Sequence, residues 1–165
     1  MAEDNKVRRC VDALIEISKT KELSMITVMD IIKEADVKRN TFYYYFGSVR
    51  DVIVTSYIEY PLTSIPKIKD VSQLVRAITE QLNIHRAFNI KVAQSKFNPV
   101  LIEAIYHWSY LCLDKINPSD TIQKLQFQAF GFSGLYVNTY AKYGNLNNAD
   151  KNYQGLEEIF KTRKF

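Results

Sequence analysis

The stretch from Thr27 to Ile53 constrains the fold most, because it contains signals for two short helices, a tight turn and the start of a third helix. Thr27 is a favoured N-cap residue, and Asp30, three positions later, can accept a hydrogen bond from the backbone of the cap. Apolar residues then recur at helical spacing and form one face: Val28, Ile31, Ile32 and Ala35. Asp36 falls at the turn, where a short polar side chain tolerates a left-handed backbone.

A second helix is expected from about Lys38. Phe42 and Phe46 stand four residues apart, so they share a face and should point to the core. The opposite face carries three consecutive tyrosines, and between Lys38 and Arg50 the chain has three basic residues and no acid. Such a face suits phosphate oxygens. The alternative is that the tyrosines form a packed hydrophobic ridge, but we favour nucleic acid because the two phenylalanines already use the inward face.

These residues resemble the TetR family of transcriptional regulators. That family shows a Thr-Val start, an Ile-Ala pair, a Gly-Val turn, a Thr-Phe-Tyr-x-x-Phe helix and a Ser-Lys-x-Asp-Leu start. In this sequence the Thr-Phe-Tyr-x-x-Phe motif begins at Thr41, and the segment that matches Ser-Lys-x-Asp-Leu begins at Ser48. Three positions depart from the pattern: Asp36 replaces the turn glycine, Lys38 a capping serine, and Val49 the lysine that family members commonly aim at a phosphate.

The resemblance implies an all-α fold with an N-terminal three-helix DNA-binding domain and a C-terminal helical ligand and dimerisation domain. The expected partner is double-stranded DNA with a palindromic operator, read by a homodimer. The candidate DNA-binding residues are Thr27, Lys38, Arg39, Asn40, Thr41, Tyr43, Tyr44, Tyr45 and Arg50. Because arginine and asparagine commonly pair with base edges, we assign Arg39, Asn40 and Tyr44 to bases. The resemblance implies that the hydroxyls of Thr27, Thr41, Tyr43 and Tyr45 contact the DNA backbone, with Arg50 as a further candidate.

The remaining helices are expected from periodicity and caps. A first helix spans about Lys6 to Lys21, and its Lys6 and Arg9 are further candidates for a phosphate contact. A fourth helix runs from Ser48 to Pro61, where the two prolines of residues 61–69 mark a linker between domains 1–60 and 70–165. After it we expect a helix from residue 70 to about 88, a shorter one around 90–97, and one from 98 to 117.

The helix expected over Ser119 to Tyr143 has two apolar lines. One line holds Ile122, Leu125, Ala129, Phe132 and Tyr136, and the other Phe130, Gly134, Val137 and Ala141. Two apolar faces require two partners, so the second face predicts a homodimer, completed by a short final helix from about Leu156 to Lys164. Six side chains are candidates for an apolar effector pocket, although they also suit plain core: Tyr106, His107, Trp108, Tyr110, Phe127 and Phe130.

Composition narrows the function classes. The chain has 165 residues, 47% of them hydrophobic, a net charge of +4, and no signal peptide or long apolar run, which predicts a cytoplasmic protein away from the membrane. Cys10 and Cys112 lack a paired spacing, and His85 and His107 lack metal-ligand spacing, so we expect no metal, cofactor or enzyme activity. Two readings remain: a dimeric DNA-binding regulator, and a helical protein-interaction module of the same fold that no longer binds DNA.

Overall fold

The computed structural model describes residues 2–60 and 68–143, apart from the side chains of residues 2–4 and 71. Every regular element in these ranges is a helix, so the fold is all-α as predicted. The described chain forms two compact units, residues 2–60 with 85–100 and residues 68–84 with 101–143. The short helix predicted near Leu156 and most of the linker predicted at 61–69 lie outside the described residues.

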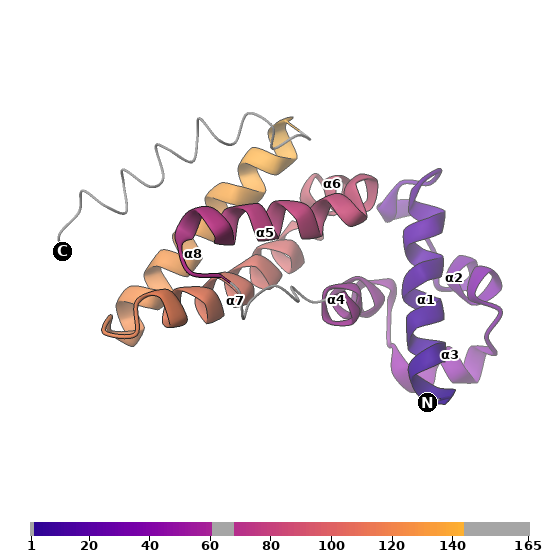
Figure 1. Cartoon of the computed structure of the whole chain (residues 1–165). Coiled ribbons are helices and arrows are strands. Elements are labelled where there is room, and N and C mark those ends of the chain that lie inside the picture. The colour runs from indigo at the N-terminus through magenta and orange to yellow at the C-terminus, as the bar shows by residue number, and fades with distance from the viewer. Residues whose placement is uncertain (1, 61–67, 144–165) are drawn as a thin grey trace. The chain divides into compact units, whose positions relative to one another are not determined.

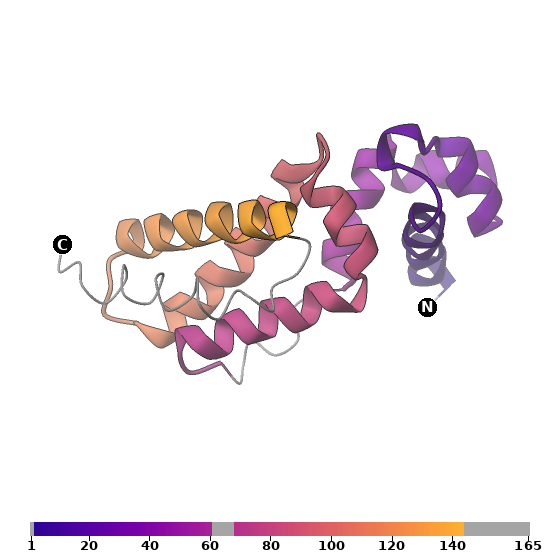
Figure 2. The ribbon, with the colours of Figure 1, turned by 90° about the horizontal axis from the view of Figure 1, so that it is seen from above.

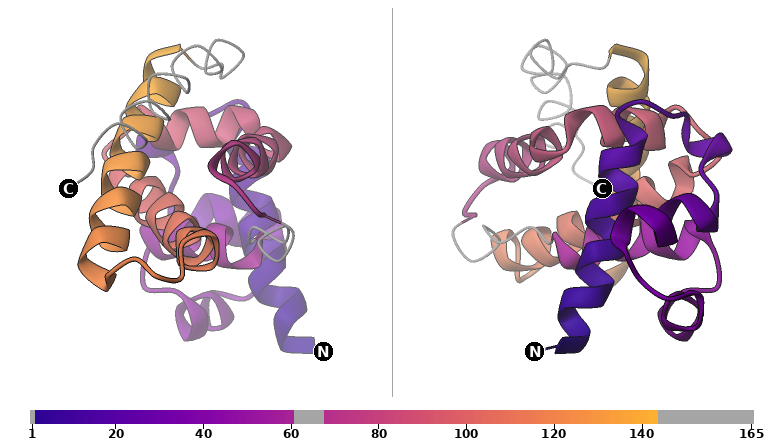
Figure 3. Two further views of the ribbon diagram at one scale, coloured as in Figure 1. Left: turned by 60° about the vertical axis from the view of Figure 1, so that its left-hand side comes forward. Right: turned by 90° about the vertical axis from the view of Figure 1, so that its right-hand side faces the viewer.

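The first unit is built around its N-terminal helix (Figure 1). The helices are α1 (Ala2–Ser18), the 3₁₀ turn η1 (Leu23–Met25), α2 (Val28–Ala35), α3 (Arg39–Tyr45), α4 (Val49–Glu59) and α6 (Arg86–Ala93). α1 packs against α2, α4 and α6, and the right-hand view of Figure 3 looks onto α1 with α2 beside it. Apolar side chains of α1 supply this core, where Val11 and Leu14 are fully buried together with Ile31 and Ile53.

Local capping explains where α2 and α4 begin. The Thr27 hydroxyl accepts from the Asp30 N–H, and the Asp30 carboxylate accepts from the Thr27 N–H at 2.7 Å, which completes the expected capping box. At α4, Ser48 accepts from the Asp51 N–H, and the Asp51 carboxylate accepts from the Gly47 N–H at 2.8 Å. Both helices therefore start where the sequence predicts.

The prediction of one helix from residue 70 to about 88 is wrong, because the chain breaks at His85. α5 (Val71–Ile84) ends there, His85 adopts φ −122° and ψ 50°, and α6 begins at Arg86. The break lets the residues after it bury in the first unit, where Phe88 packs against Tyr57 with ring centroids 6.4 Å apart. The short helix expected at 90–97 is consequently replaced by α6 over 86–93.

The second unit contains α5, α7 (Asn98–Ile116) from Leu101 onward, and α8 (Ile122–Tyr143), which Figure 2 shows grouped together. Its core joins Leu74, Ile78 and Leu82 of α5 to buried residues of α7 and α8. The hydroxyls of Thr79 and Tyr136 lie 2.8 Å apart and link α5 to α8.

Two residues of α8 differ from the predicted faces. Ile122 was expected inward but is 61% exposed, because it is the first residue of the helix. Val137 was expected on the outer line but is fully buried, since the inward arc of α8 is wide enough to include both Tyr136 and Val137. Cys10 and Cys112 are both buried free thiols, and burial raises the pKa of Cys112 to about 11.

Residues 2–60 and 68–143 contain no helix with the length and apolar character needed to cross a bilayer.

Candidate nucleic-acid interface

The turn between α2 and α3 is tight and is closed by backbone hydrogen bonds. Asp36 adopts a left-handed conformation with φ 49° and ψ 53°, as the sequence predicted, and its N–H donates to the carbonyls of Ile32 and Lys33. The Val37 N–H also donates to the Ile32 carbonyl at 3.2 Å. α3 then starts from Lys38, whose side chain makes no capping hydrogen bond.

Two phenylalanines anchor α3 to the core. Phe42 and Phe46 are both buried, and their ring centroids lie 5.3 Å apart. Because the helix has only seven residues, these two side chains fix which of its faces is turned outward. The opposite face is thereby left to the polar and tyrosine side chains.

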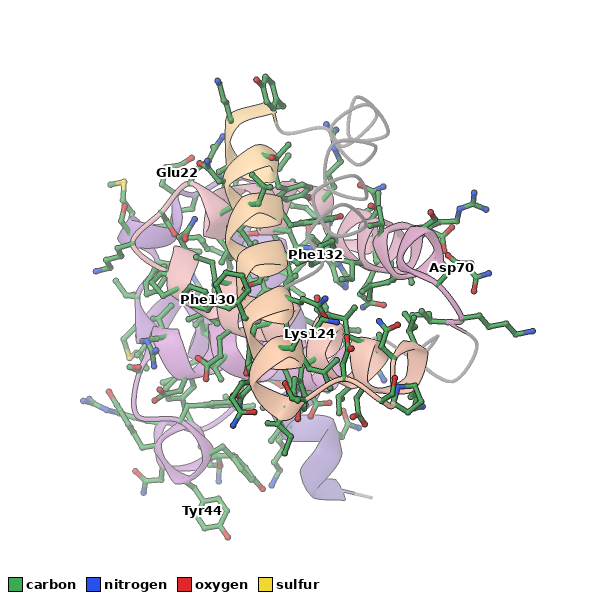
Figure 4. All side chains as sticks on the ribbon, turned by 90° about the vertical axis from the view of Figure 1, so that its left-hand side faces the viewer. Glu22, Tyr44, Asp70, Lys124, Phe130 and Phe132 are labelled. Carbon is green, nitrogen blue, oxygen red and sulfur yellow. The ribbon has the colours of Figure 1, made fainter. Side chains whose placement is uncertain are left out.

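The candidate DNA-binding residues lie on the outer surface of the first unit. Lys38, Arg39, Asn40 and Arg50 are exposed, and Thr41 and Tyr45 are half-buried. Tyr43 is 47% exposed and Tyr44 76%, and Figure 4 shows Tyr44 projecting away from α3. α3 and the first turn of α4 thus bring cations, an amide and phenolic hydroxyls onto one unit, which is the chemistry that binds phosphates and base edges.

Aromatic contacts order part of this surface before any ligand binds. The Arg39 guanidinium lies over the Tyr43 ring at 5.6 Å from its centroid, one helical turn away. The Tyr44 and Tyr45 rings meet edge to face at 4.8 Å. Ordered side chains lose less conformational entropy on binding, which favours recognition.

Thr27 is exposed, but its hydroxyl already serves the helix cap. It donates to the Asp30 carboxylate at 2.8 Å while accepting from the Asp30 N–H. Lys21 also donates to the Asp30 carboxylate at 2.7 Å. The bond from Lys21, followed by those from Thr27, lowers the pKa of Asp30 to about 2. For the Thr27 hydroxyl to donate to a phosphate, it would first have to give up its bond to the Asp30 carboxylate.

Sequence reasoning did not find the role of Arg9. Its guanidinium donates to the Asp36 carbonyl at 2.9 Å and to the Asp36 carboxylate at 3.3 Å, so α1 is joined to the turn that precedes α3. The only available signal was an exposed arginine on α1 together with a turn that lacks its usual glycine.

No family model and no curated protein matches this sequence. Among solved structures, the chain is similar to the crystal structure of the TetR family repressor AlkX from Dietzia sp. strain DQ12-45-1b, which is implicated in the biodegradation of n-alkanes. The TM-score is 0.57 at 15% sequence identity, over 93% of this chain and 92% of that chain. The fold is TetR-like. At this identity the similarity extends to the fold alone, so the roles of the TetR-like surface residues rest on their own geometry.

The six residues considered for an effector pocket lie in different environments of this TetR-like fold. Trp108 is buried, His107 is exposed, and the stacked rings of Tyr106 and Tyr110 are half-buried with centroids 6.3 Å apart. Phe127 and Phe130 are 68% and 66% exposed on α8, so neither is enclosed within this chain.

The outward face of α8 combines large apolar side chains with glycine. Phe130 lies on this face, and Figure 4 shows it on the opposite side of α8 from the buried Phe132. Leu135 is exposed as well, and a Cβ added at Gly131 or Gly134 would meet no atom within 4 Å. The outward face of α8 is therefore apolar, and two of its positions carry no side chain.

Proposed function

We propose that the protein is a TetR-type transcriptional regulator that binds a palindromic operator as a homodimer, with α3 in the major groove. The observation that carries this proposal is the two-sided character of α3. Phe42 and Phe46 hold its inner face in the core, while Arg39, Asn40 and Tyr44 are presented outward with no acid between Lys38 and Arg50. Exposed tyrosines and cations on one short helix suit contacts with phosphates and base edges.

Within this proposal the interface divides into residues that specify and residues that position. Arg39, Asn40 and Tyr44 contact base edges, and each good pairing is worth about 1 to 3 kcal/mol of discrimination. Lys38, Thr41, Tyr43, Tyr45, Arg50 and the reoriented hydroxyl of Thr27 bind the DNA backbone, which fixes register without reading sequence.

A gel-shift titration against the promoter region next to the protein's own gene tests the proposal. Asn40→Ala should relax preference at one or two base positions, whereas Tyr43→Phe should weaken binding to all sequences by a similar factor. If the unmutated protein shows no preference for any mapped site over random DNA, the proposal fails and the alternative, an interaction module of the same fold, takes its place.

The homodimer of this proposal forms through the outward face of α8, defined by Phe127, Phe130, Gly131, Gly134 and Leu135. Aromatic and aliphatic side chains that are about half exposed or more in one chain are the kind of surface that obligate dimers bury. Two-fold symmetric helix-turn-helix dimers read half-sites about 34 to 36 Å apart, so the operator of this dimer should be palindromic.

The proposal also includes a small apolar effector, which would bind the second unit and change the affinity for the operator. The candidates for its pocket in the second unit are Trp108, which is buried, and the stacked pair Tyr106 and Tyr110. Titration of apolar compounds while operator affinity is followed by fluorescence anisotropy would reveal such a ligand. The absence of any change in affinity across a chemically broad apolar set would remove the effector from the proposal and leave DNA binding intact.

A further inference from the structure

The turn before α3 is held by a side chain from another helix. Arg9, in the middle of α1, lies 27 positions before Asp36 in the sequence, yet its Nη2 donates to the Asp36 carbonyl at 2.9 Å. The same nitrogen lies 3.3 Å from the Asp36 carboxylate. The Arg9 guanidinium therefore binds both the backbone and the side chain of Asp36, the turn residue.

This turn has a specific need for outside support. Among the residues that the structure describes, Asp36 is the one non-glycine residue with positive φ. A left-handed backbone is unfavourable for a residue with a Cβ, although aspartate tolerates it better than most. Glycine would adopt it without that penalty.

α3 provides little of its own to fix the direction in which it leaves the turn. Its N-cap Lys38 makes no side-chain capping bond, and its first turn contains no acid. The anchors Phe42 and Phe46 lie in the middle and at the end of the helix. The orientation of the first residues, Arg39 and Asn40, therefore depends on the turn. In the peptide between Asp36 and Val37, the Val37 N–H donates to the Ile32 carbonyl at 3.2 Å, and the Asp36 carbonyl accepts from Arg9.

The bond to the carbonyl matters more than the ion pair. The Asp36 side chain is 97% exposed, and an exposed ion pair contributes little because water screens it. The carbonyl oxygen cannot rotate away as a side chain does, so a charged donor on it fixes the peptide plane directly.

We propose that Arg9 is a positioning residue for DNA recognition: by holding the Asp36 carbonyl, it sets the angle at which α3 presents Arg39 and Asn40 to bases. This inference rests on the proposed function. It assigns the Nη2 of Arg9 to the turn, because both hydrogen bonds to Asp36 come from that nitrogen. Arg9 has this positioning role because the turn residue is Asp36, which adopts the left-handed backbone less readily than glycine would.

The test compares Arg9→Gln with Lys33→Gln, a control that removes one exposed positive charge from α2 near the same turn. Affinity is measured for the operator and for random DNA over a series of salt concentrations, well below the melting temperature of each variant. For Arg9→Gln we expect a loss of about fivefold in operator affinity, no matching loss on random DNA, and an unchanged salt slope. Lys33→Gln should keep the ratio of operator affinity to random-DNA affinity.

Two other outcomes would overturn the inference. If Arg9 neutralises a phosphate, both affinities fall together and the salt slope drops by about one unit. If Arg9 serves stability alone, Arg9→Gln lowers the melting temperature but leaves the operator affinity of the folded protein unchanged.

A rescue experiment gives an independent readout. Asp36→Gly removes the strain of the left-handed residue, so the turn should form with less help from Arg9. In the Asp36→Gly background, Arg9→Gln should cost less than twofold in operator affinity. An undiminished fivefold loss there would contradict the positioning role. If the unmutated protein does not prefer its operator, the proposed function itself has failed, whereas normal operator binding by Arg9→Gln refutes only this inference.

Discussion

Tyr57 of α4 donates its phenolic O–H to the Asn89 carboxamide oxygen of α6 at 3.0 Å, and both residues are buried. The two residues are 32 positions apart in the sequence. The bond joins α6 to the unit that carries α3, together with the contact between the Tyr57 and Phe88 rings. A helix that follows the linker in sequence is thus part of the unit formed by the N-terminal helices.

Removal of the Tyr57 hydroxyl should weaken this attachment. Tyr57→Phe keeps the ring packed on Phe88 and deletes one buried hydrogen bond, so we expect the free energy of unfolding to fall by about 1 kcal/mol. Urea denaturation followed by circular dichroism measures it. Tyr143→Phe, at a tyrosine that is 54% exposed, is the matched control and should leave stability unchanged. Equal stability of the two variants would show that the Tyr57 hydroxyl contributes nothing net.

His85 should make stability depend on pH on the acid side of neutrality. Burial is the main reason that the pKa of His85 lies below the ordinary 6.5. The nearby Asp12 carboxylate raises this pKa in part, and the positive charge of Lys19 lowers it further. The His85 ring packs edge-on against Tyr60 at 4.8 Å, and its Nε2 is buried without a hydrogen-bond partner among the described residues. A proton on this ring would therefore be poorly solvated.

The sign follows from which state binds the proton first. Above pH 6.5 the imidazole is neutral in both states; as the pH falls through 6.5 the unfolded chain takes up the proton and stability is lost, until the folded pKa is reached. His85→Gln should flatten this part of the profile in thermal melts between about pH 7 and pH 5. His107→Gln changes an exposed histidine of α7 and serves as the control. If His85→Gln loses as much stability at acid pH as the unmutated protein does, His85 is not the source of that loss.

The sequence predicted the elements whose determinants are local. The start of α2 follows from Thr27 and Asp30, and the inward face of α3 from Phe42 and Phe46, because caps and i, i+4 pairs act within a single turn. The left-handed Asp36 was likewise expected from its residue type and position. All of these signals are confined to a few consecutive residues.

What the sequence did not predict depends on partners far along the chain. The break at His85 has no proline or glycine to announce it; the chain bends there because Phe88 and Asn89 are buried in the first unit. The contact between Arg9 and Asp36 is equally invisible to periodicity, since an arginine on the polar face of α1 looks like any solvated residue. Long-range contacts of this kind require the fold before they can be read.

Substitution at Gly134 should separate the proposed dimer from the fold of the monomer. A Cβ at this position meets nothing within 4 Å, so Gly134→Arg should leave each chain folded while it places a charge in the proposed interface. We expect monomers by sedimentation velocity at micromolar concentration and a loss of operator binding. Gly134→Ala is the control for helix propensity and should remain dimeric. A monomeric unmutated protein, or a dimeric Gly134→Arg variant, would place the interface elsewhere.

Val49 stands where the resemblance places a phosphate-binding lysine. It is the first residue of α4 and is half-buried, while its neighbour Arg50 is exposed. Val49→Lys should therefore add a phosphate contact, raise affinity for operator and random DNA alike, and steepen the salt slope by about one unit. Arg50→Ala is the converse variant, and it should reduce the slope by a similar amount if Arg50 supplies the contact in place of the missing lysine. Should Val49→Lys leave the slope unchanged while Arg50→Ala also has no effect, the start of α4 would lie away from the DNA backbone, and the assignment of Arg50 to the interface would be wrong.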